Sequence, residues 1–156
     1  AMENIPEISR ITQVGIRDFC EQEHEFTRSL GARASVFYDR DLAARRFAGE
    51  PWTKTAGEIV ETIPKQVWIT FDIDGLDPKL CPHTGTPVPG GLELAQAVHL
   101  IGLVARSGRK IIGFDLNEVS PAPGGRDEWD ANVGMRLLYK LIAWTFVSRG
   151  LRKARE

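Results

Sequence analysis

Cysteine and histidine are scarce in this sequence, which removes the protein classes that depend on them. The chain of 156 residues contains two cysteines, Cys20 and Cys81, and three histidines. Two cysteines are too few for a disulfide framework, and neither lies in a motif that marks a nucleophile. We therefore expect a protein of a reducing compartment, the cytoplasm, whose fold does not depend on disulfides.

An excess of charge and a long apolar run are also missing. Twenty Lys and Arg residues stand against 21 Asp and Glu residues, so the net charge is −1. A charge this small gives no electrostatic reason to expect binding to nucleic acid or to an anionic membrane. No stretch resembles a membrane span or a signal peptide. With 42% hydrophobic and 26% charged residues, the composition is that of an ordinary globular protein.

Short apolar stretches alternate with helical patterns along the chain. We expect strands over 11–16, 34–38, 67–71 and 110–116, and helices over 21–30, 39–48, 53–63, 92–107 and 131–148. This alternation predicts an α/β fold, with a parallel β-sheet, right-handed connections and helices on both faces.

The most informative stretch runs from Trp68 to Leu92 and reads WITFDIDGLDPKLCPHTGTPVPGGL. Its apolar run ends at Asp72, and Asp74 follows two positions later. In an extended backbone these two side chains point the same way, and two carboxylates on one side repel unless a cation lies between them. A bare D-x-D pattern is explained equally well without a cation, by one acid at the end of a strand and a second acid that caps a turn. The longer string, D-x-D-G-L-D-P followed by T-G-T-P-x-x-G-G, is far more specific.

This string resembles the signature of the ureohydrolases, the family of arginase, agmatinase and formimidoylglutamase. Those enzymes use a pair of Mn²⁺ ions to hydrolyse guanidino or formimidoyl groups. The resemblance implies that Asp72 bridges both metals and that Asp74 binds one of them. It extends from about Gln13 to near the C-terminus and implies a partial arginase-like three-layer fold.

Glu118 is the second acid of interest, in the string FDLNEVSP that follows the expected strand over 110–116. An isolated loop glutamate is usually only solvated. Here the neighbouring parallel strand would bring it near Asp72, and a carboxylate is a natural partner of a planar guanidinium. The resemblance implies that Glu118 orients the guanidinium of the substrate and that Thr86 lines the substrate pocket.

A third string, VGIRDFCEQEH, resembles the family's loop that binds the far end of the substrate. Asp18 and Glu23 match acidic positions of that loop. Cys20 stands where arginases carry a further acid, which disfavours L-arginine as the substrate. The ending from FDLNEVSP onward is closer to agmatinases and formimidoylglutamases.

Two metal-binding strings of the family, a GGDHS-like and a DAHxD-like one, are not found in this sequence, nor is its acid/base histidine. His24 and His83 lack a clear ligand context, although His83 precedes the T-G-T-P loop, and His99 is expected to be structural. We therefore interpret residues 1–156 as one partial domain, the C-terminal half of a ureohydrolase, inactive by itself, with a flexible tail over 149–156. Missing strands would leave an open sheet edge and an apolar face, so we expect a homo-oligomer.

Two other functions remain open. FDIDGLD also resembles the D-x-D-G start of haloacid-dehalogenase-type phosphatases, with Asp72 as the nucleophile and Asp74 as the acid/base. That family usually has Thr or Val where this chain has Leu76, and it leaves the T-G-T-P loop unexplained. The other possibility is a non-catalytic half-domain that acts through association only.

Overall fold

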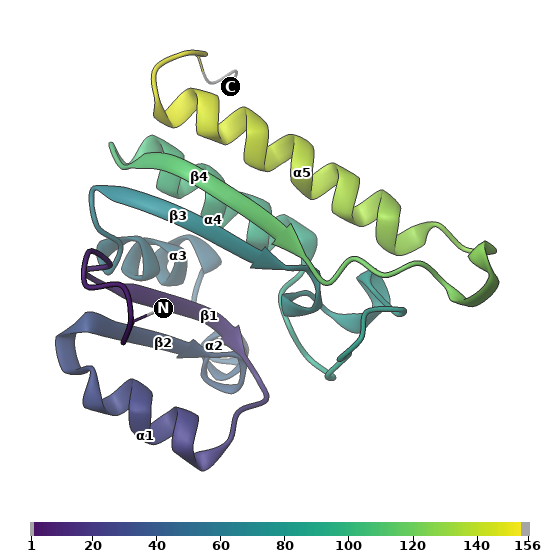
Figure 1. Ribbon diagram of the computed structural model, residues 1–156, viewed down its shortest axis with the longest axis horizontal. Coiled ribbons are helices and arrows are strands. Elements are labelled where there is room, and N and C mark those ends of the chain that lie inside the picture. The colour runs from purple at the N-terminus through teal and green to yellow at the C-terminus, as the bar shows by residue number, and fades with distance from the viewer. Residues whose placement is uncertain (1, 154–156) are drawn as a thin grey trace. The chain divides into compact units, whose positions relative to one another are not determined.

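The computed structural model describes residues 2–153, and the chain divides between Pro64 and Lys65 into two compact units (Figure 1). The strands pair within the units, as β1 with β2 and as β3 with β4, and each pair is parallel. No helix of the described residues is long and apolar enough to cross a membrane.

The first unit contains a two-stranded parallel sheet and three α-helices. Its elements are β1 (Ile11–Ile16), α1 (Glu21–Ser29), the 3-10 turn η1 (Gly31–Arg33), β2 (Ala34–Tyr38), α2 (Asp39–Phe47) and α3 (Trp52–Glu61). Helix α3 buries Thr55, Ala56, Ile59 and Val60, a spacing that places them on one side of the helix. Helix α1 buries no residue, and α2 buries Leu42.

The second unit carries the D-x-D string and has a larger core. Its elements are β3 (Gln66–Asp72), the 3-10 turns η2 (Ile73–Gly75) and η3 (Pro78–Leu80), α4 (Leu94–Arg106), β4 (Lys110–Asn117), the 3-10 turn η4 (Pro123–Gly125) and α5 (Trp129–Ser148). Helix α5 packs against both α4 and β4. Ile73, Leu76, Ile111, Leu137 and Leu141 are fully buried in this unit.

One face of the β3–β4 sheet is open to solvent. Along β3 the exposed positions alternate with half-buried ones, as the period of a strand requires. Trp68 lies on the open face and is 58% exposed. Its ring covers Gly113 of β4 so closely that a Cβ atom at Gly113 would lie 2.2 Å from the ring. A side chain at position 113 would therefore force the Trp68 ring to move.

The α/β fold class, the four strands and their parallel direction are confirmed. Hydrogen-bonded pairing is found within each unit, of β1 with β2 and of β3 with β4, and the joining of the two pairs into one sheet stays a prediction. Alternation of strands and helices predicts strand direction but carries no information on which distant strands pair. Helix α5 begins at Trp129, two residues before the helix expected over 131–148. The tail predicted over 149–156 lies partly outside the described residues, and its flexibility stays a prediction.

Candidate active site

The carboxyl ends of β3 and β4 meet at one edge of their sheet, because the two strands are parallel. Asp72 is the last residue of β3 and is paired in register with Asn117, the last residue of β4. The Asn117 side-chain amide donates a hydrogen bond of 3.0 Å to Asp72 Oδ1. Glu118 follows Asn117 directly, so the chain brings Asp72 and Glu118 to the same edge, where ligands bind in parallel α/β sheets.

Asp74 is held by a turn and not by a strand. The extended backbone expected from Asp72 to Asp74 is wrong, because β3 ends at Asp72 and Ile73–Gly75 is a 3-10 turn. The cause is the burial of Ile73 and Leu76, both 0% exposed, since residues three apart lie on one side of a 3-10 turn. This turn leaves Asp74 within reach of Thr86, whose hydroxyl donates to Asp74 Oδ2 at 2.8 Å.

The loop over residues 84–86 connects the two acidic positions. The Thr84 hydroxyl, which is almost fully buried, donates to the backbone carbonyl of Glu118 at 3.0 Å. A Cβ atom added at Gly85 would lie 3.7 Å from Glu118 Oε2. Thr86 then binds Asp74. Consecutive residues of the T-G-T segment therefore contact Glu118 on one side and Asp74 on the other.

Glu118 has an unusual backbone conformation. Its φ angle is +62°, and it is the only residue other than glycine with a positive φ in the described part of the chain. This left-handed conformation costs an L-residue about 1–2 kcal/mol, since Cβ approaches the following carbonyl oxygen. Such strain persists only where the surrounding structure enforces it, and it is concentrated at functional sites.

Asp115 accepts hydrogen bonds from three side chains of the β3–β4 sheet, one of which also binds Asp72. Its carboxylate accepts hydrogen bonds from Thr70 Oγ1 and Trp68 Nε1, each at 2.5 Å, and from Asn117 Nδ2 at 2.6 Å. The Thr70 hydroxyl, followed by the Trp68 and Asn117 donors, holds the pKa of Asp115 below its usual value. Because Asn117 donates to both Asp115 and Asp72, an ionised Asp115 fixes the amide that orients Asp72.

Asn117 belongs to the candidate site but was not predicted from the sequence. The available signal was its period-two spacing from Asp115, on a strand expected to run beside the one that ends at Asp72. His83 was considered from the sequence, but its partner was not: its ring lies 2.8 Å from Asp130 of α5. That partner is 47 positions away in the sequence, and no local pattern predicts the contact.

Asp18 and Glu23, the residues expected to bind the far end of the substrate, belong to the first unit. Both are exposed, Asp18 between β1 and α1 and Glu23 in the first turn of α1. Beside them, the rings of Phe19, His24 and Tyr38 pack together, and His24 Nδ1 lies 2.9 Å from the Tyr38 hydroxyl. The role of Asp18 and Glu23 in substrate binding stays a prediction.

Carboxylate oxygens are the ligands that Mn²⁺ prefers among protein groups. Asp72 and Asp74 therefore have the right chemistry, and both are anchored by hydrogen-bond donors. Two carboxylates do not complete a metal site. The described residues contain no group of three or more His, Cys, Asp or Glu side chains able to hold a metal ion. The role of Asp72 and Asp74 as metal ligands stays a prediction.

Comparisons with known proteins place this arrangement in a family. A guanidinobutyrase from Pseudomonas aeruginosa is 31% identical over 147 residues, which cover 90% of this chain and 42% of that protein. An agmatinase from Chromobacterium violaceum is 41% identical over 92 residues, 54% of this chain and 28% of that protein. Among solved structures, proclavaminate amidino hydrolase from Streptomyces clavuligerus superposes with a TM-score of 0.72 at 27% identity, covering 90% of this chain and 44% of that one.

The chain spans less than half the length of each of these three proteins. The model of the Arginase family matches residues 1–143, which include both strings at the candidate site and the loop before α1. The family expected from the D-x-D-G-L-D-P and T-G-T-P strings is therefore confirmed, and the chain belongs to the Arginase family.

Proposed function

We propose that this chain is part of a Mn²⁺-dependent hydrolase that cleaves the C–N bonds of guanidino or formimidoyl compounds. The observation that carries the proposal is the placement of Asp72 and Glu118 at one sheet edge, with the T-G-T loop hydrogen-bonded to the Glu118 backbone and to Asp74. The family match accounts for that loop, whereas the phosphatase alternative leaves it unexplained.

The side chains divide into two roles. Asp72 and Asp74 would bind the metal, and Asn117 and Thr86 would keep their carboxylates oriented. When bound, a pair of Mn²⁺ ions would supply a water acidic enough to act as a nucleophile near neutral pH. Glu118 would bind the planar cationic group of the substrate through paired, charge-assisted hydrogen bonds.

The relatives include arginases as well as an agmatinase and a guanidinobutyrase, so they do not choose among guanidino compounds. The choice of substrate rests on Cys20, which stands where arginases carry an acid. We infer a guanidino or formimidoyl compound other than L-arginine, and we propose Asp18 and Glu23 as further substrate-binding residues.

The missing metal ligands lead to a further part of the proposal: the 156-residue chain by itself has no turnover. A metal that activates water must be held by enough ligands to fix its geometry while one position stays open. Asp72 and Asp74 alone do not meet this requirement. The alternative of a non-catalytic half-domain applies to the isolated chain and makes the same assay prediction for it.

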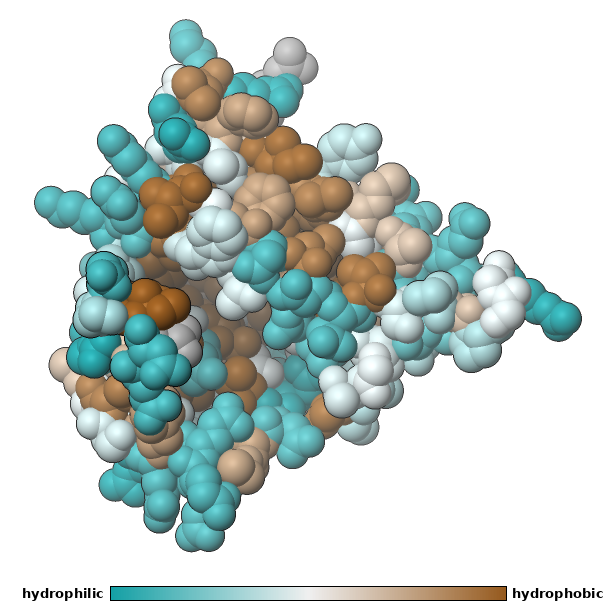
Figure 2. Space-filling view, viewed as in Figure 1, coloured by the Kyte–Doolittle hydropathy of each residue, from teal (hydrophilic) through white to brown (hydrophobic). Residues whose placement is uncertain are grey.

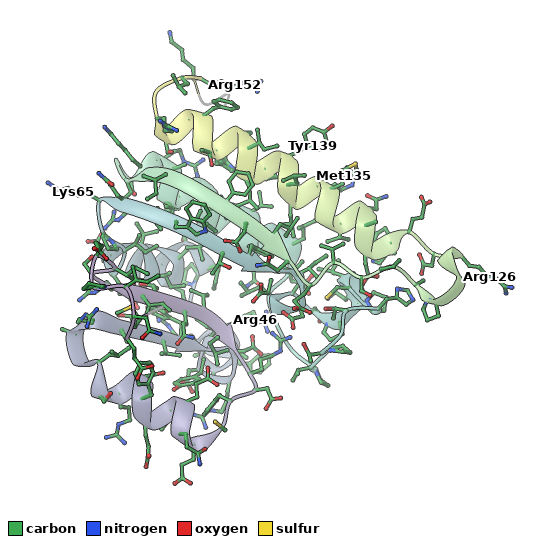
Figure 3. All side chains as sticks on the ribbon, viewed as in Figure 1. Arg46, Lys65, Arg126, Met135, Tyr139 and Arg152 are labelled. Carbon is green, nitrogen blue, oxygen red and sulfur yellow. The ribbon has the colours of Figure 1, made fainter. Side chains whose placement is uncertain are left out.

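The proposal also includes a cytoplasmic location and association of the chain with further copies of itself. Hydrophobic side chains gather along α5 (Figure 2). Met135 and Tyr139, which are 45% and 67% exposed, project from α5 on the side away from β4 (Figure 3). Exposed apolar patches of this kind favour association, and we expect a homo-oligomer.

Two substitutions test the proposed roles, in an active protein that contains this chain and the remaining metal ligands. Asp72→Ala should abolish Mn²⁺-dependent release of urea or formamide and weaken Mn²⁺ binding in a calorimetric titration. Glu118→Gln should raise KM and leave Mn²⁺ binding unchanged. Glu128→Gln is the matched control, since Glu128 is exposed and its side chain does not cap α5. Hydrolysis of a phosphate ester, or full turnover by Asp72→Ala, would contradict the proposal.

A further inference from the structure

We propose that His83, Thr84 and Asp130 are positioning residues that hold Glu118 in its left-handed backbone conformation. They would thereby aim the carboxylate that binds the substrate cation. The inference rests on the role of Glu118 in the proposed function, but its structural part can be tested without any activity.

The first link is a buried carboxylate in α5. Asp130 is 1% exposed and lies in the first turn of the helix. Its Oδ2 accepts the backbone N–H of His83 at 3.0 Å, and its Oδ1 lies 2.8 Å from His83 Nδ1. A buried carboxylate is tolerated only when its oxygens find donors. With Asp130 ionised, both the backbone and the ring of His83 donate, and this double contact fixes the loop residue in place.

The second link runs through the next residue to Glu118. Thr84 is 4% exposed, and its hydroxyl donates to the Glu118 carbonyl oxygen at 3.0 Å. A continuous series of contacts therefore leads from Asp130 through His83 and Thr84 to the strained residue. Removal of the Thr84 hydroxyl would take this donor away from the Glu118 carbonyl.

Packing on the other side of Glu118 supports the same conformation. Val119 lies against Gly134 of α5, where an added Cβ atom would come within 3.0 Å of Val119 Cγ2. Glu118 is thus flanked by a hydrogen bond to the loop and by close packing on α5, and both supports depend on the same helix. This is the kind of surrounding that can maintain a positive φ in a residue other than glycine.

The consequence for binding is geometric. The direction of the Glu118 side chain is set by its own φ, so a return to negative φ would swing Cβ and the carboxylate to a new position. The carboxylate now lies beside Gly85, where a Cβ atom would come 3.7 Å from Oε2. Loss of the Thr84 hydroxyl should therefore act on binding of the cationic group and leave the metal ligands Asp72 and Asp74 in place.

The variants that test this are Thr84→Val, which removes the donor with little change of shape, and Thr84→Ser, which restores it. Asp130→Asn is a second variant that keeps the size of the side chain but weakens the contact with His83. Thr55→Val is the matched control, because Thr55 is a buried threonine of the first unit, and its hydroxyl donates to a Glu50 carboxylate at 2.8 Å.

The structural measurement is NMR of the whole chain. A positive φ brings the amide proton close to Hα of the same residue and gives a strong intraresidue cross-peak. We expect that cross-peak at Glu118 in the unmodified chain, in Thr84→Ser and in Thr55→Val, and its loss or weakening in Thr84→Val and Asp130→Asn. If Thr84→Val does not fold, the comparison of Asp130→Asn with the unmodified chain decides the question.

The kinetic measurement uses an active protein that contains this chain. Removal of a single hydrogen bond corresponds to a factor of about five to ten in binding. Thr84→Val should therefore raise KM by about that factor while kcat and Mn²⁺ affinity change by less than about twofold. Thr84→Ser should restore KM. If Thr84 only stabilised the fold, KM, kcat and Mn²⁺ affinity of the folded Thr84→Val variant would all be unchanged.

The outcomes separate this inference from the proposed function. If the cross-peak responds as expected but no guanidino or formimidoyl compound is hydrolysed, the proposed function fails and the positioning role stands. If the unmodified chain lacks the cross-peak, or folded Thr84→Val keeps both the cross-peak and the original KM, the positioning role is overturned.

Discussion

Glycine at position 118 should make this protein more stable than alanine does, against the usual order of these two residues. The reason is the φ angle of +62° at Glu118. Alanine must pay the steric cost of the left-handed conformation, whereas glycine, which has no Cβ atom, adopts it freely.

The size of the difference follows from two opposing effects. The left-handed conformation costs an L-residue about 1–2 kcal/mol. Glycine in turn lowers the unfolding free energy by about 0.4–1 kcal/mol relative to alanine, because the unfolded chain with glycine has more conformations to lose on folding. We therefore expect Glu118→Gly to exceed Glu118→Ala in unfolding free energy by about 0.5–1 kcal/mol. For a chain of this size the difference corresponds to about 1–4 °C in Tm.

The measurement is urea unfolding of the two variants side by side, with a control pair at Lys140. Lys140 is exposed in the interior of α5, where glycine should be less stable than alanine by about 0.8–1.0 kcal/mol. The two pairs are thus expected to differ in opposite directions. If glycine is less stable than alanine at both positions, Glu118 does not hold a positive φ in solution, and the positioning role of Thr84 loses its basis.

Three further outcomes follow from the hydrogen bonds of the second unit. Thr86→Val removes the donor to Asp74 Oδ2 and should weaken Mn²⁺ binding by an active protein containing this chain about 10-fold or more, whereas Thr86→Ser should not; calorimetry measures both. Thr70→Val removes the main cause of the lowered pKa of Asp115 and should raise that pKa toward its usual value in a carboxyl NMR titration. Since the folded pKa lies below the unfolded one, the stabilisation from Asp115 is present above the unfolded pKa and is lost as pH falls through the folded pKa, so the stability gap between the variants should close on acidification. The Thr145 hydroxyl is buried with no hydrogen-bond partner among the described residues, and Thr145→Val should leave the unfolding free energy unchanged or raise it by up to about 1 kcal/mol.

Local sequence signals predict the elements of this fold well and their assembly less well. The helix expected over 39–48 is found at Asp39–Phe47, and the strand expected over 67–71 is found at Gln66–Asp72. Glycine, proline and capping residues mark such limits within a few positions of the chain. Which strands pair, β1 with β2 and β3 with β4, depends on contacts between distant segments, and alternation of elements does not encode it.

At the candidate site, too, the sequence predicts the local elements better than the contacts between distant residues. The D-x-D pattern fits an extended strand equally well, and only the burial of Ile73 and Leu76 shows why the chain turns between the two acids. The partners of Glu118 and His83 are 34 and 47 positions away. Contacts at these separations follow from the packing of α5, and neither propensity nor spacing predicts them.

The central claim is that this chain supplies the carboxylates of a Mn²⁺-dependent ureohydrolase but not the whole metal site. The most direct test compares release of urea or formamide, at equal Mn²⁺, by the 156-residue chain and by a longer protein in which this chain is joined to the missing metal ligands. Agmatine, guanidinobutyrate, L-arginine and a formimidoyl amino acid serve as substrates. We expect no turnover by the chain alone and Mn²⁺-dependent turnover by the longer protein on a substrate other than L-arginine. Turnover by the chain alone, or a longer protein that binds Mn²⁺ yet hydrolyses none of these compounds, would contradict the claim.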